Sequence, residues 1–198
     1  MKICFASNNA HKLAEIRQLL GAPFELVSLA ELGCTEELPE DQDTLEGNAQ
    51  QKASYVWERF GVPCFADDTG LEVEALHHEP GVYSARYAGP ARDNQANMQK
   101  VLDNLSGQTN RKARFRTCIA LILGEEDQHV FNGIVEGHIL EEKRGEQGFG
   151  YDPIFVPEGH DRSFAQMSSQ EKNTISHRGR AVQQLVSFLQ HRYVQTGT

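Results

Sequence analysis

The sequence has little basic charge and no long hydrophobic run. Its 198 residues include 28 Asp and Glu against 19 Lys and Arg, which leaves a formal net charge of −9. A general nucleic-acid binder needs a basic surface, so this balance argues against one. No apolar stretch approaches the roughly 18 residues of a membrane-spanning helix, and no signal peptide follows Met1. We expect a cytoplasmic protein that binds neither nucleic acid nor membrane.

Several common site signatures are also missing. The four cysteines (Cys4, Cys34, Cys64 and Cys118) lie at least 30 residues apart, so no CxxC spacing for zinc or thiol redox chemistry exists. There is no GxGxxG after a strand and no GxxxxGKS/T, which excludes the dinucleotide fingerprint and the P-loop. No GxSxG surrounds a serine, so a serine hydrolase has no support.

The hydrophobic pattern that is present predicts an α/β fold in a single domain over residues 1–198. Short apolar runs predict strands at 3–6, 24–29, 62–66, 115–123 and 130–140. Apolar residues at helical spacing predict helices ending near 20, 60, 105 and 189, and Ser168 with Glu171 forms a capping box for a shorter helix. Residues 124–128 read as a hairpin loop, so we expect a mixed sheet rather than a purely parallel one.

Two polar clusters sit where predicted strands end, which is where α/β proteins place their sites. The run Ser7, Asn8, Asn9, Ala10, His11 and Lys12 precedes the first helix and suits phosphate oxygens, although it also fits an ordinary capped helix. Asp67 and Asp68, followed by Thr69 and Gly70, form a carboxylate pair that suits Mg²⁺, although an Asx-rich turn has the same composition.

Two further clusters lie in the second half of the chain. In the segment from Gly148 to Pro153, Phe149 can lie against a flat ligand beside the Asp152 carboxylate, although a Gly-Pro turn with packed aromatics also fits. Lys172, His177 and Arg178 offer donors to anionic oxygens or a carbonyl, although they also fit a basic helix surface.

The segment 31–46 carries seven acids and neither Lys nor Arg, and within it Glu40 is a possible metal ligand in what otherwise reads as a solvated loop. Taken together, the clusters indicate a Mg²⁺-dependent protein that handles nucleotides. They identify neither the nucleotide nor the bond.

Five motifs in order resemble one family across nearly the whole chain. They are SNNAHKLAEI, FADDTGLEV, PGVYSARYAG, GFGYDPIF and EKNTISHRG. They are similar to the non-canonical purine nucleoside triphosphate pyrophosphatases, the inosine triphosphate or dITP/XTP pyrophosphatase family. The resemblance implies hydrolysis of ITP, dITP and XTP to the monophosphate and pyrophosphate, which cleanses the nucleotide pool of deaminated purines. It also implies Mg²⁺ dependence, a homodimer, and an elongated mixed sheet flanked by helices, with two lobes around a central cleft.

The resemblance assigns roles to individual residues. Asp68 matches the proton acceptor and a metal ligand, Glu40 looks like the counterpart of a second metal ligand, and Asp67 is a neighbour in the metal shell. The remaining matches are substrate contacts: Ser7, Asn8, Asn9, Ala10, His11, Lys12 and Lys52 at the triphosphate, Thr69, and Phe149, Gly150, Tyr151, Asp152, Lys172, His177 and Arg178 toward the base.

One position departs from the family pattern. The family usually reads F-x-E-N-A, whereas this chain has Leu45-Glu46-Gly47-Asn48-Ala49, so Gly47 stands where an acid is expected. Two other functions stay open on the sequence: a pyrophosphatase for other modified nucleotides, and a catalytically silent nucleotide-binding protein. The apolar residues of 80–87 can pack either within the chain or at an interface between copies.

Overall fold

The structure, a computed structural model, describes residues 1–196 and contains a six-stranded sheet with helices on both faces. The strands are β1 (Lys2–Phe5), β2 (Glu25–Ser28), β3 (Cys64–Val73), β4 (Lys112–Gly124), β5 (Asp127–Ile139) and β6 (Phe155–Pro157). The α-helices are α1 (Ala10–Leu20), α2 (Leu45–Phe60), α3 (Asn94–Asn104), α4 (Ser169–Ile175) and α5 (His177–Thr196). Four 3-10 helices are η1 (Glu74–Leu76), η2 (Gly81–Arg86), η3 (Asp152–Ile154) and η4 (Phe164–Gln166).

The sheet has the order β2-β1-β3-β4-β5-β6 and mixes strand directions. β1 runs parallel to both β2 and β3, whereas β5 and β6 are antiparallel. β4 and β5 are neighbours joined by a turn at Glu125 and Glu126, a link too short for anything but a hairpin. The predicted mixed α/β sheet is therefore confirmed, and the hairpin turn is tighter than the predicted loop 124–128.

Side-chain caps fix where the helices begin. The Asn9 side chain accepts a hydrogen bond from the Lys12 backbone N–H at the start of α1, and Thr44 does the same for Gly47 at the start of α2. Asp93 caps α3, where its side chain accepts hydrogen bonds from the Gln95 and Ala96 backbone N–H groups. The predicted capping box is present at α4, where Ser168 and Glu171 bond each other's backbone N–H groups.

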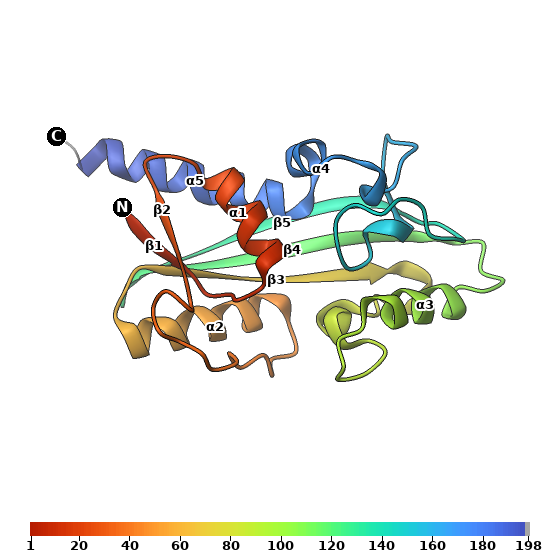
Figure 1. The fold of residues 1–198 in the computed structure, drawn as a ribbon, viewed down its shortest axis with the longest axis horizontal. Coiled ribbons are helices and arrows are strands. Elements are labelled where there is room, and N and C mark those ends of the chain that lie inside the picture. The colour runs from red at the N-terminus through yellow and green to blue at the C-terminus, as the bar shows by residue number, and fades with distance from the viewer. Residues whose placement is uncertain (197–198) are drawn as a thin grey trace. The chain divides into compact units, whose positions relative to one another are not determined.

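The chain divides into two compact units. Unit 1 consists of Met1–Asp68, Thr117–Gly133 and the chain from Gly179 on, and unit 2 consists of Thr69–Arg116 and Ile134–Arg178. Within unit 1, α1 and α5 cover one face of the strands and α2 covers the other (Figure 1). Its core joins buried residues of β1, β3 and β4 to Ile16 and Leu20 of α1 and Leu185 and Leu189 of α5.

Unit 2 has its own hydrophobic core. Met98 and Val101 of α3, with Leu105 directly after the helix, pack with Leu71 and Val73 at the end of β3. The same core contains an aromatic group of three, in which Phe115 lies edge-on to Phe155 and stacks on Phe164. Because each unit buries its own apolar cluster, the local geometry of each can be considered separately.

The predicted end of the third strand is wrong. The predicted strand 62–66 was expected to end before the acidic pair, but β3 runs from Cys64 to Val73 and carries Asp67 and Asp68 in its interior. Lysine and amide partners satisfy both carboxylates, so the strand continues through residues that usually occur in turns.

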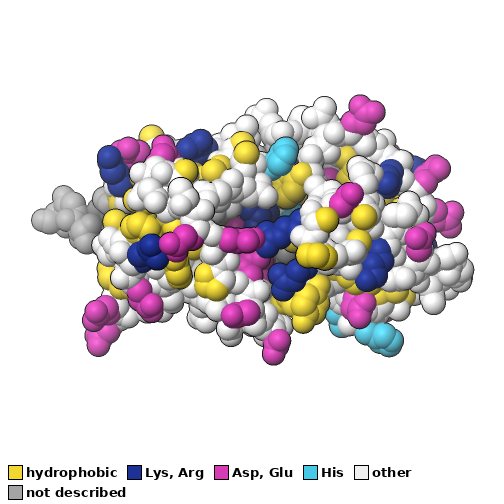
Figure 2. Space-filling model, turned by 60° about the horizontal axis from the view of Figure 1, so that its bottom comes forward, with side chains coloured by type: hydrophobic (Ala, Val, Ile, Leu, Met, Phe, Trp, Pro, Cys, Tyr) yellow, Lys and Arg dark blue, Asp and Glu magenta, His cyan; other side chains and the backbone are white. Residues whose placement is uncertain are grey.

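Charges of both signs stand side by side on the face drawn in Figure 2, rather than forming a basic surface. Among the described residues, no helix is long and apolar enough to span a membrane.

Candidate active site

In unit 1, five charged side chains from four segments form what we call the carboxylate–lysine cluster. Its members are Lys12, Glu40, Lys52, Asp67 and Asp68. The Lys12 ammonium lies 3.0 Å from Asp67 Oδ1. The Lys52 ammonium lies 2.6 Å from Glu40 Oε1 and 3.9 Å from Asp68 Oδ1, and it donates to the Asp67 carbonyl oxygen at 2.6 Å. The structure thus brings together the acidic loop, α1, α2 and β3 at one place within unit 1.

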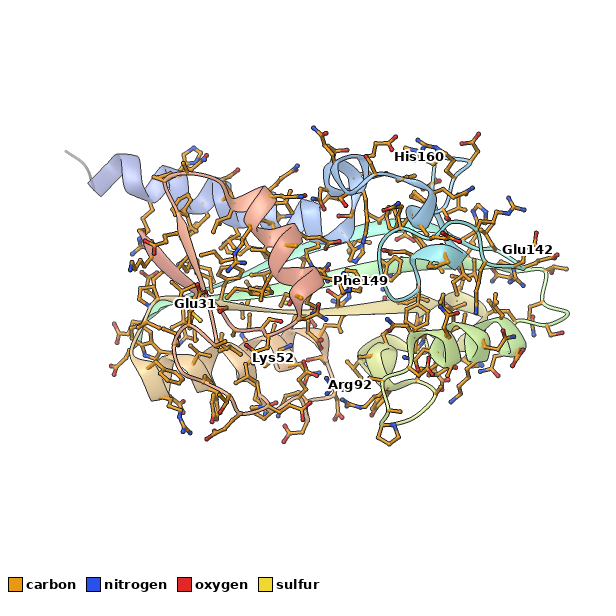
Figure 3. The ribbon with its side chains drawn as sticks, in the orientation of Figure 1. Glu31, Lys52, Arg92, Glu142, Phe149 and His160 are labelled. Carbon is orange, nitrogen blue, oxygen red and sulfur yellow. The ribbon has the colours of Figure 1, made fainter. Side chains whose placement is uncertain are left out.

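Burial makes these charges unusual. Lys52, which projects from α2 (Figure 3), is 5% exposed, and Asp67 and Asp68 are 1% and 8% exposed. Burial alone would lower the pKa of the Lys52 ammonium, but the surrounding carboxylates raise it above its usual value. Burial raises the pKa of the Asp68 carboxyl, and the nearby lysines offset this shift only in part. Lys52 therefore stays charged, while Asp68 has gained basicity relative to an exposed aspartate.

Sequence analysis missed one member of this site, Asn48. Its side-chain amide donates to Asp68 Oδ2 at 2.9 Å, and its carbonyl oxygen accepts from the Gln42 backbone N–H at 2.9 Å. The signal was present in the sequence, because Asn48 and Lys52 fall on the buried stripe of α2 among Leu45, Ala49, Ala53 and Val56. A polar residue on a buried helical stripe requires a polar partner.

The donor set was tested against a divalent cation. No group of three or more His, Cys, Asp or Glu side chains in the described residues has metal-binding geometry. Mg²⁺ is commonly held by only one or two carboxylates together with water and substrate phosphate oxygens. Glu40 and Asp68 share the neighbour Lys52, so two carboxylates are available in one place. The cluster fits Mg²⁺ in this substrate-assisted form, and Asp67 is engaged with Lys12.

The predicted phosphate loop lies at the start of α1. Ser7 Oγ accepts from the Asn9 backbone N–H at 3.1 Å, which shapes the turn between β1 and α1. Asn8, Asn9, Ala10 and His11 are exposed at the beginning of the helix, and Lys12 leads from there into the carboxylate–lysine cluster. The first turn of α1 contains no acidic residue, so no carboxylate of this turn competes with an anion at the helix N-terminus.

In unit 2, a second set of charged groups surrounds Phe149, which lies in the loop between β5 and η3 (Figure 3). Lys172 Nζ lies 2.7 Å from Asp152 Oδ2, and both side chains are almost fully buried. Asp152 also accepts from the Phe149 backbone N–H at 3.0 Å. The Phe149 ring has Lys172 Nζ at 4.8 Å and the Arg178 guanidinium carbon at 5.4 Å from its centroid. We call these four residues the aromatic–cation cluster.

Thr69, His177 and Tyr151 lie near the aromatic–cation cluster or hold its loop in unit 2. Arg178 Nη2 lies 3.5 Å from Thr69 Oγ1, and the His177 ring stacks on Phe115 at 4.5 Å. The Tyr151 hydroxyl donates to the Ser84 carbonyl oxygen at 2.6 Å, and burial raises its pKa. Tyr151 therefore anchors the loop through its hydroxyl group. Gly148 and Gly150, with φ of 76° and 63°, turn the loop on either side of Phe149.

The structure also explains the exceptional Gly47. It is the third residue of α2, the position from which an acid completes a capping box with the Thr44 cap. A Cβ here would lie 2.9 Å from Gln42 Cβ and 3.0 Å from Thr44 Oγ1. The loop before α2 therefore occupies the space that a side chain at position 47 would need.

Comparisons with known proteins show the family of this chain. The model of the Ham1 family matches residues 3–188. A dITP/XTP pyrophosphatase of Porphyromonas gingivalis is 57% identical over 189 residues, which are 95% of this chain and 97% of that protein. A dITP/XTP pyrophosphatase of Bacillus subtilis is 45% identical over 93% of this chain and 95% of its own.

Solved structures of Ham1 proteins also match this chain over nearly its full length. The Ham1 protein of Staphylococcus aureus superimposes with a TM-score of 0.89 at 38% identity, covering 97% of this chain and all of its own. The HAM1 protein of Coxiella burnetii also gives 0.89, at 39% identity over 96% of this chain and 99% of its own. With a family model, close relatives and solved folds in agreement over nearly the full length, this chain belongs to the Ham1 family.

Proposed function

We propose that the protein is a Mg²⁺-dependent nucleoside triphosphate pyrophosphatase, a single catalytic domain over residues 1–198. Its substrates are the deaminated purine nucleotides ITP, dITP and XTP, which it converts to the monophosphate and pyrophosphate. The observation that carries this proposal is the carboxylate–lysine cluster, in which three acids and two lysines are held at one place. The names of relatives at 57% and 45% identity support the same reaction.

In this reaction, a water oxygen bonds to the α-phosphorus and the bond from that phosphorus to the bridging oxygen of the β-phosphate breaks. Asp68 accepts the proton of the attacking water, and its raised pKa suits that role. Pyrophosphate leaves with the electron pair of the broken bond. The ammonium groups of Lys12 and Lys52 offset charge on the phosphate oxygens. Mg²⁺, held by Glu40 and Asp68, would polarise phosphate oxygens and add further positive charge.

The aromatic–cation cluster supplies the means of base selection. Hypoxanthine and xanthine carry a carbonyl at C6, whereas adenine carries an amino group there. An Arg178 or His177 donor matches the carbonyl and would meet another donor in adenine. A buried donor left without an acceptor gives strong discrimination, of order 10⁴ in sites built around such a hydrogen bond. The Phe149 ring offers a flat apolar surface beside the Arg178 guanidinium.

We also propose that the protein acts as a homodimer in the cytoplasm, where nucleoside triphosphates are used. Alternate residues on one face of β5 are exposed, including Val130 at 41% and Ile134 at 37%. Val130 and Ile134 are among the exposed large hydrophobic side chains of the described residues, and a second copy placed on this face would remove them from water. Light scattering should give twice the mass of 22.2 kDa, and Ile134→Glu should shift the protein toward monomer.

The experiment that tests the function is pyrophosphate release from ITP, XTP, dITP, GTP, ATP, CTP and UTP, with Mg²⁺ and with EDTA. We expect strong preference for ITP, dITP and XTP, no turnover in EDTA, and loss of turnover in Asp68→Asn with nucleotide binding retained. Flat or pyrimidine-biased turnover would reject the base assignment and favour a pyrophosphatase for other nucleotides. Binding without turnover would favour a silent nucleotide-binding protein.

A further inference from the structure

We propose that Asn48 is a positioning residue for the proposed reaction, and that its side-chain amide holds the Asp68 carboxylate and the Glu40 loop in one arrangement. The inference rests on the proposed function, because the catalytic role of Asp68 belongs to it. Asn48 itself carries no charge, and its side-chain amide is hydrogen-bonded to Asp68 and to the Gln42 backbone N–H.

Both ends of the Asn48 amide are engaged. The side chain is 1% exposed, its Nδ2 donates to Asp68 Oδ2 at 2.9 Å, and its Oδ1 accepts from the Gln42 backbone N–H at 2.9 Å. A flipped amide would point its oxygen at a carboxylate and its NH₂ group at an N–H, so both contacts would become repulsive. The two bonds therefore fix the orientation of the amide, and the amide fixes the orientation of Asp68.

This orientation determines which oxygen of Asp68 faces the charges of the cluster. With Oδ2 held by Asn48, Oδ1 is the oxygen that lies 3.9 Å from Lys52 Nζ. A carboxylate without this amide can rotate about its terminal torsion, which has a broad energy profile. The donor thus keeps the proton-accepting group in one rotamer, as outer partners of metal-bound carboxylates commonly do.

The hydrogen bond from the Gln42 backbone N–H to Asn48 Oδ1 also fixes the acidic loop. Gln42 follows Glu40 by two residues, and Glu40 Oε1 lies 2.6 Å from Lys52 Nζ. The Gln42 side chain lies against Gly47, where the absence of a Cβ permits the close approach. Asn48 is therefore bonded both to β3, which carries Asp68, and to the loop that carries Glu40.

The chain offers a matched control on the same helix. Gln51 also holds the loop, since its Oε1 accepts from the Asp41 N–H at 3.2 Å and its Nε2 donates to Asp41 Oδ1 at 2.6 Å. These bonds are exposed and do not involve Asp68. Gln51→Ala thus removes a tether between loop and helix while leaving the Asp68 carboxylate held.

The test compares Asn48→Ala, Asn48→Ser, Asn48→Asp and Gln51→Ala in the full chain. We expect kcat for ITP to fall 10- to 100-fold in each Asn48 variant, with KM changed less than about threefold. Gln51→Ala should stay within threefold of wild type in both constants. If Asn48→Ala does not fold, Asn48→Ser, which is small, polar and uncharged, tests the same fall in kcat.

Amide hydrogen exchange on the metal-free protein gives a readout independent of activity. The Gln42 N–H should exchange faster in Asn48→Ala and remain protected in Asn48→Asp, which keeps an acceptor oxygen but puts a second carboxyl group against Asp68 in place of the neutral amide donor. Slow turnover in Asn48→Asp with a protected Gln42 N–H would assign the effect to Asp68 rather than to the loop.

The outcomes separate the inference from the proposed function. Turnover by wild type, together with Asn48→Ala and Asn48→Ser variants that keep kcat within threefold, overturns the role of Asn48 alone. Equal losses in Asn48→Ala and Gln51→Ala also overturn it, because general loosening of the loop would then account for both. Absence of turnover in wild type refutes the proposed function itself.

Discussion

Replacing Lys52 by Met should destabilise the protein strongly when divalent cations are absent. Met fills a similar volume but removes the ammonium group that Glu40 and Asp68 share, whereas the Asp67 carboxylate keeps Lys12 as its partner. The Lys52 side chain is 6% exposed, so water cannot replace the lost cation. Removing one partner of a buried charge pair typically costs about 3–5 kcal/mol.

The distances in the structure agree with that magnitude. At an effective dielectric constant of about 20, the contact of 2.6 Å to Glu40 corresponds to about 6 kcal/mol and the contact of 3.9 Å to Asp68 to about 4 kcal/mol. Most of this attraction is offset because the variant no longer has to desolvate the ammonium group. We expect a net loss of about 4 kcal/mol, or about 8–16 °C in Tm for a chain of this size.

The assay is urea unfolding and calorimetry in EDTA, with Lys2→Met as the control. Lys2 pairs with Glu25 at 3.3 Å, but the two side chains are 74% and 64% exposed, so its replacement should cost less than about 1 kcal/mol. Adding Mg²⁺ should restore part of the stability of Lys52→Met by supplying positive charge to the same carboxylates. A Lys52→Met protein within about 1 kcal/mol of wild type in EDTA would refute the electrostatic account.

Three other outcomes are expected. Gly148 and Gly150 both have positive φ, so alanine strains the backbone at either position. Gly148→Ala also places a Cβ on the Asp152 carboxylate and should raise KM for ITP at least tenfold, whereas Gly150→Ala, whose Cβ meets no atom within 4 Å, should raise it much less; equal KM values would contradict the packing argument. Burial raises the pKa of the Cys4 and Cys64 thiols to about 12. Their thiolate fraction at pH 8 is therefore about 10⁻⁴, and Ellman's reagent should not label them until the chain unfolds. These folded-state pKa values lie above the ordinary thiol pKa of 9.0. The stability contributed by the neutral thiols is therefore complete below pH 9 and is lost as the pH rises toward 12, which unfolding curves across that range will check. Gly137→Ala places a Cβ on the Val156 carbonyl oxygen and should cost about 1–3 kcal/mol in urea unfolding, while Gly124→Ala, whose Cβ meets only ordinary contacts, serves as its control.

Much of the fold is readable from the sequence, because local signals specify it. Asn9 and Ser168 cap helices where their positions predict, and the hairpin between β4 and β5 follows from two long strands with a short link. The extent of β3 is not readable, because local propensity places Asp67 and Asp68 in a turn. Their partners come from α1 and α2, which are distant in sequence.

The residues of the candidate site can be picked out from the sequence, but several of their contacts cannot. Motifs identify Lys12, Asp68 and Phe149, because their types and spacing carry chemistry directly. The sequence does not show that Asp67 engages Lys12 or that Asn48 holds Asp68, since both contacts depend on tertiary packing. The role of Tyr151 in anchoring its loop to Ser84 likewise depends on a contact across 67 positions of the chain.

The close approach of Gln42 to Gly47 has an evolutionary consequence. A substitution at position 47 alone would collide with the loop, and a change in the loop alone would leave a gap beside a bare helix position. Each single step is therefore disfavoured, while the paired change is tolerated, so the two positions are expected to show epistasis. Relatives with an acid at the position of Gly47 should differ from this chain at the position of Gln42 as well, and grafting that acid here should succeed only together with their loop.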